Sequence, residues 1–449
     1  MFVVRMTAEW NRWIADLAAP LHGRNRWRLQ SVIVGIRFAS GRRTVSSWWR
    51  ASGVGFLYRS YYYFLDSVGR KILPVATALL QIVLNHVEAA SEQFHLFAID
   101  DSPTHRFGPK VQGAGYHHNP TPGPAGSKFL FGHNWVVLTR LARHSQFGLI
   151  SFPLIGQLYV REKEIPLLPK KLGVVFRTKL ELAANQIRWL GSQRKFLSKP
   201  IWMAVDGFYA KKPIFQAARE QNIVIATRIR VDSKLFEPPP KLKPGQKRGP
   251  GQPPKYGKNK IHLSKRDAHH QGWTKIEVLT TEGRKVTKYY KSILATWAIA
   301  SGLVRIVILK EEDGSWRPLL CSDPSACVEL IIQASTDRWG IEQSFHDLKE
   351  VEGIEQVQLR RYYSNVGALN LNLWVHTLTE VWAWRKSTEE LVNRQASPWD
   401  QADRRPSHAD RRKSLKQYVM RQEYLRLDIP DRLRKRIQPF VEMLQLRAA

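Results

Sequence analysis

The spacing of apolar residues divides the chain into a helical start, a strand-rich middle and a helical end. Residues 1–90 carry apolar side chains at helical spacing with few strand signals, and the sequence beyond about residue 360 is again helical. Between them, short apolar runs bounded by turn residues predict strands. In chain order, the first part of this middle region predicts strands at 94–101, 128–141 and 146–160, a helix at 172–190, a strand at 201–206, a helix at 211–221 and a strand at 222–230.

Carboxylates stand at the ends of two of these strands. The first ends in Asp100 and Asp101, and the fourth ends in Asp206. Three strands, a helix, a strand, a helix and a strand, with acids at these ends, is the layout of an RNase H-like fold. Strand signals return from 272 to 321, before a helix that contains Glu342. We therefore predict an α/β RNase H-like core interrupted by a β-rich insertion, with helical N- and C-terminal domains.

The charge balance narrows the choice of partner. The 449 residues include 70 Lys and Arg against 38 Asp and Glu, a formal net charge of +32. This excess favours a polyanion held partly by counterion release, and DNA or RNA is the leading candidate. No apolar run approaches the ~18–20 residues of a membrane-spanning helix. The first 13 residues lack the features of a signal peptide, so we expect a cytoplasmic protein without membrane attachment.

Two basic segments are candidate contacts for nucleic acid. Residues 41–59 combine Ser, Thr and Gly with several arginines, and fit either a helix-turn-helix whose arginines face phosphate or a plain helical bundle. Residues 241–266 are rich in Pro, Gly and Lys, contain no acid, and include Lys247, Arg248 and Lys255. This second segment is either a solvated linker or a loop that orders on a DNA groove.

Residues 337–349, DRWGIEQSFHDLK, concentrate polar chemistry on one predicted helix. Arg338 and Glu342 are one turn apart, and Lys349 follows Glu342 by two turns. A carboxylate between two cations suits a metal ion held beside a phosphodiester, since the acid ligates the metal while the cations bind phosphate oxygens. An amphipathic helix with solvated ion pairs has the same spacing.

Glu342 and the strand-end acids form the set that two-metal phosphoryl transfer requires. A pair of divalent ions shares one bridging carboxylate and takes further ones, activating the attacking oxygen and stabilising the leaving one. Oxygen ligands suit Mg²⁺, with Mn²⁺ as a substitute. Each acid also has a structural alternative, because Asp100, Asp101 and Asp206 could make caps or turns, and Glu342 could pair with Arg338.

The chain resembles the DDE transposases of bacterial insertion sequences, in particular the branch with a β-rich insertion between the second Asp and the Glu. The resemblance rests on AIDDSP, GAGYHHN with FGHNWVVL, AVDGFYAKKP and DRWGIEQSFHDLK, and runs from about 94 to 359. The last segment is similar to the branch's Y-x2-R-x3-E-x6-K signature. Ser335 stands where that signature has its Tyr.

The resemblance implies roles for the matching acids. Asp101, in preference to Asp100, matches the first catalytic and metal-binding Asp. Asp206 matches the second, and Glu342 matches the acid that completes the triad. The implied cofactor is Mg²⁺, with Mn²⁺ as an alternative.

The resemblance also implies contacts with DNA. Arg338 and Lys349 match the phosphate-contacting cations of the signature helix. In this branch a Trp of the insertion stacks on a base flipped out of the DNA end. Trp316 lies near the expected place, with Trp297 and Trp273 as alternatives and a core position open for all three.

The implied function is that of a transposase. Such a protein binds the terminal inverted repeats of its element, cuts the double-stranded DNA with a metal-activated water and joins the freed 3′-OH to target DNA, as a homodimer on paired ends. An inactive relative that only binds DNA, or another RNase H-like nuclease, are the alternatives. The predicted domains are a helical DNA-binding domain at 1–90, the first part of the core at 91–230, the insertion at 231–325, the core helix with Glu342 at 326–360 and a basic helical region at 361–449.

Overall fold

The computed structural model of the chain describes residues 5–87, 92–119, 126–240, 252, 254–392, 394, 399–401 and 403–448, with side chains as far as residue 441. The α-helices are α1 (Ala8–Ala18), α2 (Gly23–Phe38), α3 (Val45–Ala51), α4 (Tyr58–Gly69), α5 (Ile72–His86), α6 (Lys179–Ser192), α7 (Lys212–Glu220), α8 (Leu263–Ala268), α9 (Val328–Asp337), α10 (Trp339–His346), α11 (Tyr362–Ala383), α12 (Thr388–Leu391), α13 (His408–Leu425) and α14 (Asp431–Ala448). The short 3-10 turns are η1 (Glu162–Leu167), η2 (Lys170–Leu172), η3 (Arg194–Phe196) and η5 (Ile354–Gln356), and η4 (Asp347–Val351) is a π-helical turn.

The strands form one mixed sheet. They are β1 (His95–His105), β2 (Gly115–His118), β3 (Phe129–His144), β4 (Gly148–Tyr159), β5 (Ile201–Val205), β6 (Val224–Arg228), β7 (Leu235–Phe236), β8 (Lys260–Ile261), β9 (Thr274–Leu279), β10 (Lys285–Trp297), β11 (Gly302–Lys310) and β12 (Trp316–Cys321). Centrally, β1 pairs antiparallel with β3 and parallel with β5, β5 pairs parallel with β6, and β4 pairs with β3. The five strands predicted for the first part of the core are therefore present in the predicted order, and the short β2 is an addition that the sequence did not predict.

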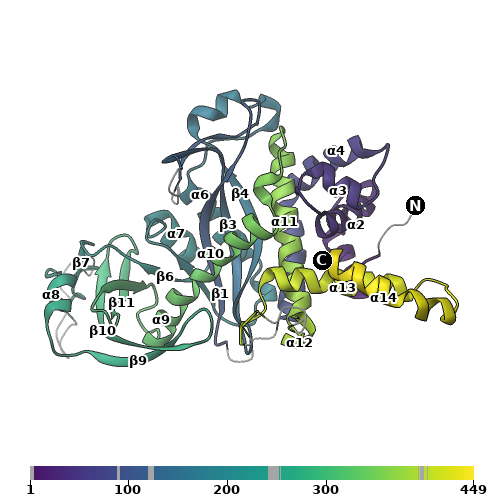
Figure 1. Ribbon diagram of the computed structural model, residues 1–449. Helices are drawn as coiled ribbons and strands as arrows, with labels where there is room; N and C mark the ends of the chain where they lie inside the picture. The colour runs from purple at the N-terminus through teal and green to yellow at the C-terminus, as the bar shows by residue number, and fades with distance from the viewer. Residues whose placement is uncertain are drawn as a thin grey trace.

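The strands of the predicted insertion continue the core sheet. Strand β12 pairs antiparallel with β6, with Leu320 opposite Thr227, and β11, β10, β7 and β8 follow outward, with β9 on β10. In Figure 1 this β-rich part lies at the opposite end of the molecule from the N-terminal helices. The insertion is thus joined to the core by backbone hydrogen bonds, an arrangement that its local sequence pattern did not predict.

Side chains of the central strands alternate between two hydrophobic clusters. Phe97 and Ile99 of β1 belong to the larger cluster, which includes apolar residues of α6, α7 and α11. Leu96 and Ala98 belong to the smaller one, with residues of α9 and α10 such as Ile341. Since successive strand residues point to opposite faces, helix α10 and helix α6 cover opposite sides of β1.

Local caps set where the helices begin. The sequence predicted a helix from residue 172, but α6 starts at Lys179 because Gly173 takes a left-handed conformation (φ 63°) and Thr178 closes a capping box with Glu181. Helix α3 starts after Thr44, whose side chain accepts a hydrogen bond from the Ser47 N–H.

The N-terminal helices pack on the side of α11 and α13 (Figure 1). Helix α4 lies against α11 through two glycines: a Cβ at Gly69 would lie 2.0 Å from the Tyr363 carbonyl oxygen, and a Cβ at Gly367 would lie 2.1 Å from the Leu65 carbonyl oxygen. Among the described residues no single helix is long and apolar enough to cross a membrane, while α4 and α5 taken together, with a bend of 79° between them, meet that test by length and composition.

Candidate active site

Strand alternation sorts the acids at the carboxyl ends of β1 and β5. Asp100 follows Ala98 of β1 by two residues, and Asp206 follows Ala204 of β5 by two, so both point to the face that α9 and α10 cover. Asp101 points to the opposite face, toward α6. The two strands are parallel neighbours, which places their acidic ends side by side.

Arg338 pairs with two acids, Glu342 on helix α10 and Asp100 on strand β1. Its Nη1 donates to Asp100 Oδ2 (3.1 Å), and its Nη2 donates to Glu342 Oε1 (2.7 Å). The second bond is the one-turn pair that the sequence predicted, but the first joins residues 238 positions apart. One guanidinium therefore binds both carboxylates, which keeps Asp100 and Glu342 close together.

The field of these neighbours alters the acidity of the strand-end acids. Burial raises the pKa of Asp100 to about 7, with Asp206 and Asp101 adding to the rise and Arg338 opposing it. Burial also raises the pKa of Asp206, again with a contribution from Asp101. Carboxylates this close disfavour each other's charge, and a bound cation would relieve that repulsion.

Hydrogen bonds from the turn that follows Asp206 fix the position of its carboxylate. Its Oδ1 accepts hydrogen bonds from the backbone N–H groups of Phe208 (3.0 Å) and Tyr209 (3.2 Å), and its carbonyl accepts one from the Thr227 hydroxyl (3.1 Å). The turn predicted as a structural alternative is therefore present. It leaves Asp206 Oδ2 without a hydrogen bond from any described residue, so the same side chain can also act as a ligand.

Asp101, the acid that the sequence analysis preferred to Asp100, is occupied elsewhere. Lys179 Nζ lies 2.6 Å from its Oδ2, and the buried Tyr209 hydroxyl donates to its Oδ1 at 2.9 Å. Its backbone N–H donates to Asp100 Oδ1 at 2.8 Å. The motif match counts positions along the chain and carries no information about the face of the strand on which each acid lies.

The other residues predicted to contact DNA lie in different elements of the structure. Lys349 is half-buried in η4 and lies in the field of Glu355 and Glu350, and burial lowers its pKa. Trp316 is half-buried at the start of β12 and packs against the larger cluster. Lys255 is exposed, and Lys247 and Arg248 lie outside the described residues.

The structure also shows where the two alternative tryptophans and an arginine of segment 41–59 lie. Trp297 is in the core, edge-on to Phe215, and the Trp273 ring lies under the ammonium groups of Lys291 and Lys310. In segment 41–59, which fits either a helix-turn-helix or a plain helical bundle, Arg43 is directed inward, where Nη1 donates to the Val351 carbonyl. Helix α3, the helix within segment 41–59, packs against α2, and α4, which starts at the end of the segment, packs against α11.

Three residues near the acids were missed by sequence reasoning. Tyr209 joins the two strand ends, since its N–H bonds Asp206 and its hydroxyl bonds Asp101. Lys179 neutralises Asp101, and Phe208 presents an aromatic ring that is 50% exposed. Only Tyr209 and Phe208 carried a signal, as members of the block that contains Asp206.

The donor set of Asp100, Asp206 and Glu342 fits a divalent metal. All donors are carboxylate oxygens, the type that Mg²⁺ and Mn²⁺ prefer. Asp206 retains an oxygen without a protein partner, and the mutual repulsion of the acids favours a cation between them. These three residues would hold the metal.

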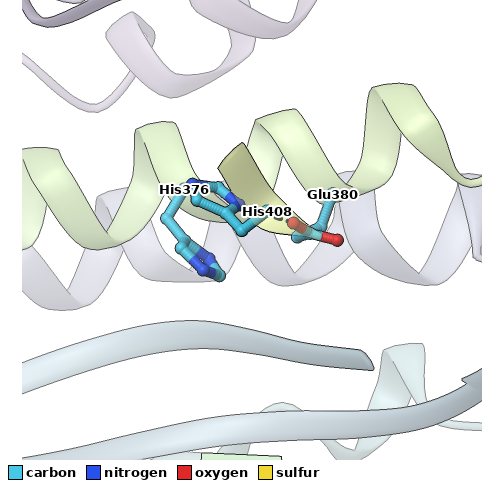
Figure 2. Close-up of side chains that lie close together, drawn as sticks. All are labelled: His376, Glu380 and His408. Carbon is cyan, nitrogen blue, oxygen red and sulfur yellow. Dashed lines mark hydrogen bonds and ion pairs between the residues drawn. The ribbon is translucent and has the colours of Figure 1, made fainter. Parts of the chain in front are cut away.

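A second group, His376, Glu380 and His408, has ligand atoms within 4.8 Å of one another (Figure 2). His408 Nδ1 donates to Glu380 Oε1 (2.6 Å) and Nε2 donates to Glu352 Oε1 (2.8 Å). Burial would lower the pKa of His408, but these two hydrogen bonds raise it to about 9, and a protonated imidazole is no metal ligand.

The surroundings of this second group also disfavour a cation. The rings of His376 and His408 stack with centroids 4.0 Å apart at 19°, whereas two imidazoles that share a metal must both have it in their ring planes. Arg37 pairs with Glu352 and Arg411 with Glu380. The cluster is therefore a buried ion-pair network between α2, the residue after η4, α11 and α13.

A mixed sheet with three carboxylates gathered at the ends of parallel strands and on a helix is an arrangement that suits metal-assisted phosphoryl transfer. The family model described as "DDE superfamily endonuclease" matches residues 16–291. This is more than half of the chain, and the chain belongs to that family. The match includes both strand-end acids and ends before Glu342.

Other comparisons add little to this assignment. Among solved structures, the chain is similar to that of the piggyBac transposase synaptic complex with hairpin DNA, with 11% identity, a TM-score of 0.36, and coverage of 97% of this chain and 81% of that chain. No curated protein matches.

Proposed function

We propose that the protein is a DNA transposase of a bacterial insertion sequence, which cuts and transfers strands at the terminal inverted repeats of its element. The observation that carries the proposal is the placement of Asp100, Asp206 and Glu342 around Arg338 on one face of the sheet. Membership in the DDE superfamily endonucleases supports the nuclease part. Asp100 takes the place that the resemblance gave to Asp101.

Each residue of the proposed active site has its own role. Asp100, Asp206 and Glu342 would hold the metal, and Mg²⁺ or Mn²⁺ bound there would supply the charge that activates the attacking oxygen and stabilises the leaving one. Arg338 pairs with Asp100 and Glu342, and its guanidinium would be able to bind phosphate oxygens beside a metal held by these acids. Tyr209 and Lys179 fix the strand ends through Asp101.

The partner is double-stranded DNA, both the element's ends and the target. The formal charge of +32 supports a polyanion. A homodimer that holds two ends together is part of the proposal, because strand transfer of an element needs both ends at one place.

Cleavage of the element's own end DNA tests the proposal. With Mg²⁺, Asp206→Asn and Glu342→Gln should each lower the cleavage rate by roughly 10³-fold or more, because a lost ligand forfeits several kcal/mol of transition-state stabilisation. Binding to the same DNA in EDTA should remain. Gel assays of nicked and joined products measure both steps.

Asp313→Asn is the matched control, since Asp313 caps the exposed turn between β11 and β12. Cleavage by Glu342→Gln at the wild-type rate would refute the proposed active site. Binding to end DNA without Mg²⁺-dependent cleavage by the wild type would instead support the inactive DNA-binding alternative.

A further inference from the structure

A cleft of about 960 Å³ opens directly beside Asp206. Its walls are the turn after β5 (206–211), the end of β6 with the following turn (228–233) and the segment of β8 and α8 (260–264). The cleft thus lies between the central strands and the β-rich end of the sheet. Its volume is near the top of the range of clefts that enclose small ligands, ~300–1,000 Å³.

The charge of the cleft is mainly positive. Lys211, Arg228 and Lys260 line it, are exposed, and have no ion pair among the described residues. Arg230 also lines it but donates two hydrogen bonds to Asp232, both at 2.9 Å, so that its charge is balanced. Three unbalanced cations beside an acidic metal-binding set favour an anion that extends away from the acids.

The cleft also has apolar surface. Ile229, Ile261 and Leu263 are buried beneath it, and the half-exposed ring of Phe208 stands at the end next to Asp206. Phe208 follows Asp206 by two residues, and its backbone N–H donates to that carboxylate. An aromatic face among cations is the combination that binds the bases and phosphates of a single strand.

We propose that this cleft binds one strand of DNA next to Asp206. Lys211, Arg228 and Lys260 contact its phosphates, and the Phe208 ring stacks on a base. The cleft volume of about 960 Å³ is small and admits a few nucleotides of one strand. The inference rests on the proposed function for the identity of the polymer as DNA.

The test compares two fluorescent DNA probes in EDTA, so that no cleavage occurs. One is a blunt 15-base-pair duplex, and the other is the same duplex with a single-stranded tail of six nucleotides. Wild type should bind the tailed probe more tightly than the blunt one. Lys211→Ala/Lys260→Ala should lose that difference and lower the slope of log Kd against log salt by about 1.4, at ~0.7 per single-strand phosphate contact.

Lys212→Ala is the matched control. Lys212 is the next residue after Lys211 and is also exposed, but it faces a different hollow, lined by Arg177 and Arg188. It should keep the preference for the tail. Phe208→Leu keeps an apolar side chain without the ring and should weaken tail binding by about 5- to 100-fold, the loss of one base stack.

Equal affinity of wild type for both probes would overturn the proposal, as would an equal loss in Lys211→Ala/Lys260→Ala and Lys212→Ala. A stronger preference for an RNA tail than for a DNA tail would also overturn it. Thermal unfolding of each variant identifies those that fail to fold. Glu342→Gln separates the two hypotheses: it should keep the tail preference while losing Mg²⁺-dependent cleavage, so that failure of one leaves the other intact.

Discussion

Asp100 and Asp101 are neighbours in the chain and face opposite sides of the sheet. Asp100 shares Arg338 with Glu342, whereas Asp101 binds Lys179 and Tyr209. One residue of displacement along a strand therefore separates a candidate metal ligand from a residue that positions the strand. The backbone bond from Asp101 N–H to Asp100 Oδ1 connects the two roles.

This geometry predicts different effects when each of the two aspartates is replaced by asparagine. Asp100→Asn should abolish Mn²⁺ binding at the site and reduce cleavage by roughly 10³-fold, because it removes a charged ligand. Asp101→Asn should keep Mn²⁺ binding and reduce cleavage by no more than about 10- to 100-fold, the usual cost of losing a supporting partner. Calorimetry of Mn²⁺ binding and the gel assay measure the two effects. Loss of Mn²⁺ binding in Asp101→Asn alone would restore the assignment made from the sequence.

At this scale the residue types could be predicted, but not all of their neighbours. The Arg338–Glu342 pair follows from helical spacing. The Asp100–Arg338 bond depends on how α10 crosses β1, and Tyr209 acquires its role only because β1 and β5 are adjacent. Contacts between segments more than a hundred residues apart leave no local pattern.

Among the elements, the contact of α4 with α11 depends on backbone approach. Gly69 and Gly367 lie opposite each other, and the Cβ positions at 2.0 and 2.1 Å from carbonyl oxygens leave no space for a methyl group. The close packing attaches the N-terminal helices to α11, which in turn packs on β4.

Gly367→Ala should therefore destabilise the protein by about 2–4 kcal/mol, since the helices must separate to admit the side chain. Gly23→Ala is a suitable control, because its added Cβ would have no atom within 4 Å. Urea unfolding measures both variants. A midpoint for Gly367→Ala equal to that of wild type would contradict the structure of this contact.

The buried network around His408 connects other elements and titrates. Arg37 of α2, Glu352 after η4, His376 and Glu380 of α11, and Arg411 and Arg412 of α13 surround the imidazole. Burial would raise the pKa of Glu380, but Arg411 and His408 lower it to about 2, while the pKa of His408 rises to about 9. The paired, charged state is the one present near neutral pH.

The raised pKa of His408 fixes the sign of a pH effect. Its contribution to stability is fully present below the unfolded-state pKa of ~6.5 and is lost as pH rises through about 9. Wild type should therefore lose unfolding free energy between pH 6.5 and 9. His408→Gln should be less stable at pH 6.5 by about 3–5 kcal/mol and show a flatter profile.

Thermal or urea unfolding across this pH range checks the prediction, with His270→Gln, at an exposed position, as the control. A profile for His408→Gln parallel to that of wild type would assign the slope to other groups. Added Zn²⁺ should leave the wild-type melting temperature unchanged, because the network already holds a protonated imidazole.

For the whole molecule, the sequence predicted the succession of helical, mixed and β-rich parts but not how they join. Periodicity within β10, β11 and β12 identifies strands, and nothing in it specifies that β12 pairs with β6, about 90 residues earlier. The same limit hid the cleft beside Asp206, whose walls come from three separate segments.

The pairing of β12 with β6 has a mechanical result. Strands β5, β6 and β12 are successive neighbours, so a pivoting movement of the β-rich end would have to break ladder hydrogen bonds within three strands, about 15 Å, of Asp206. The outer part of the sheet is therefore a fixed arm rather than a swinging flap. Under the proposed function, a nucleic acid bound along that arm would meet the acids at a constant distance.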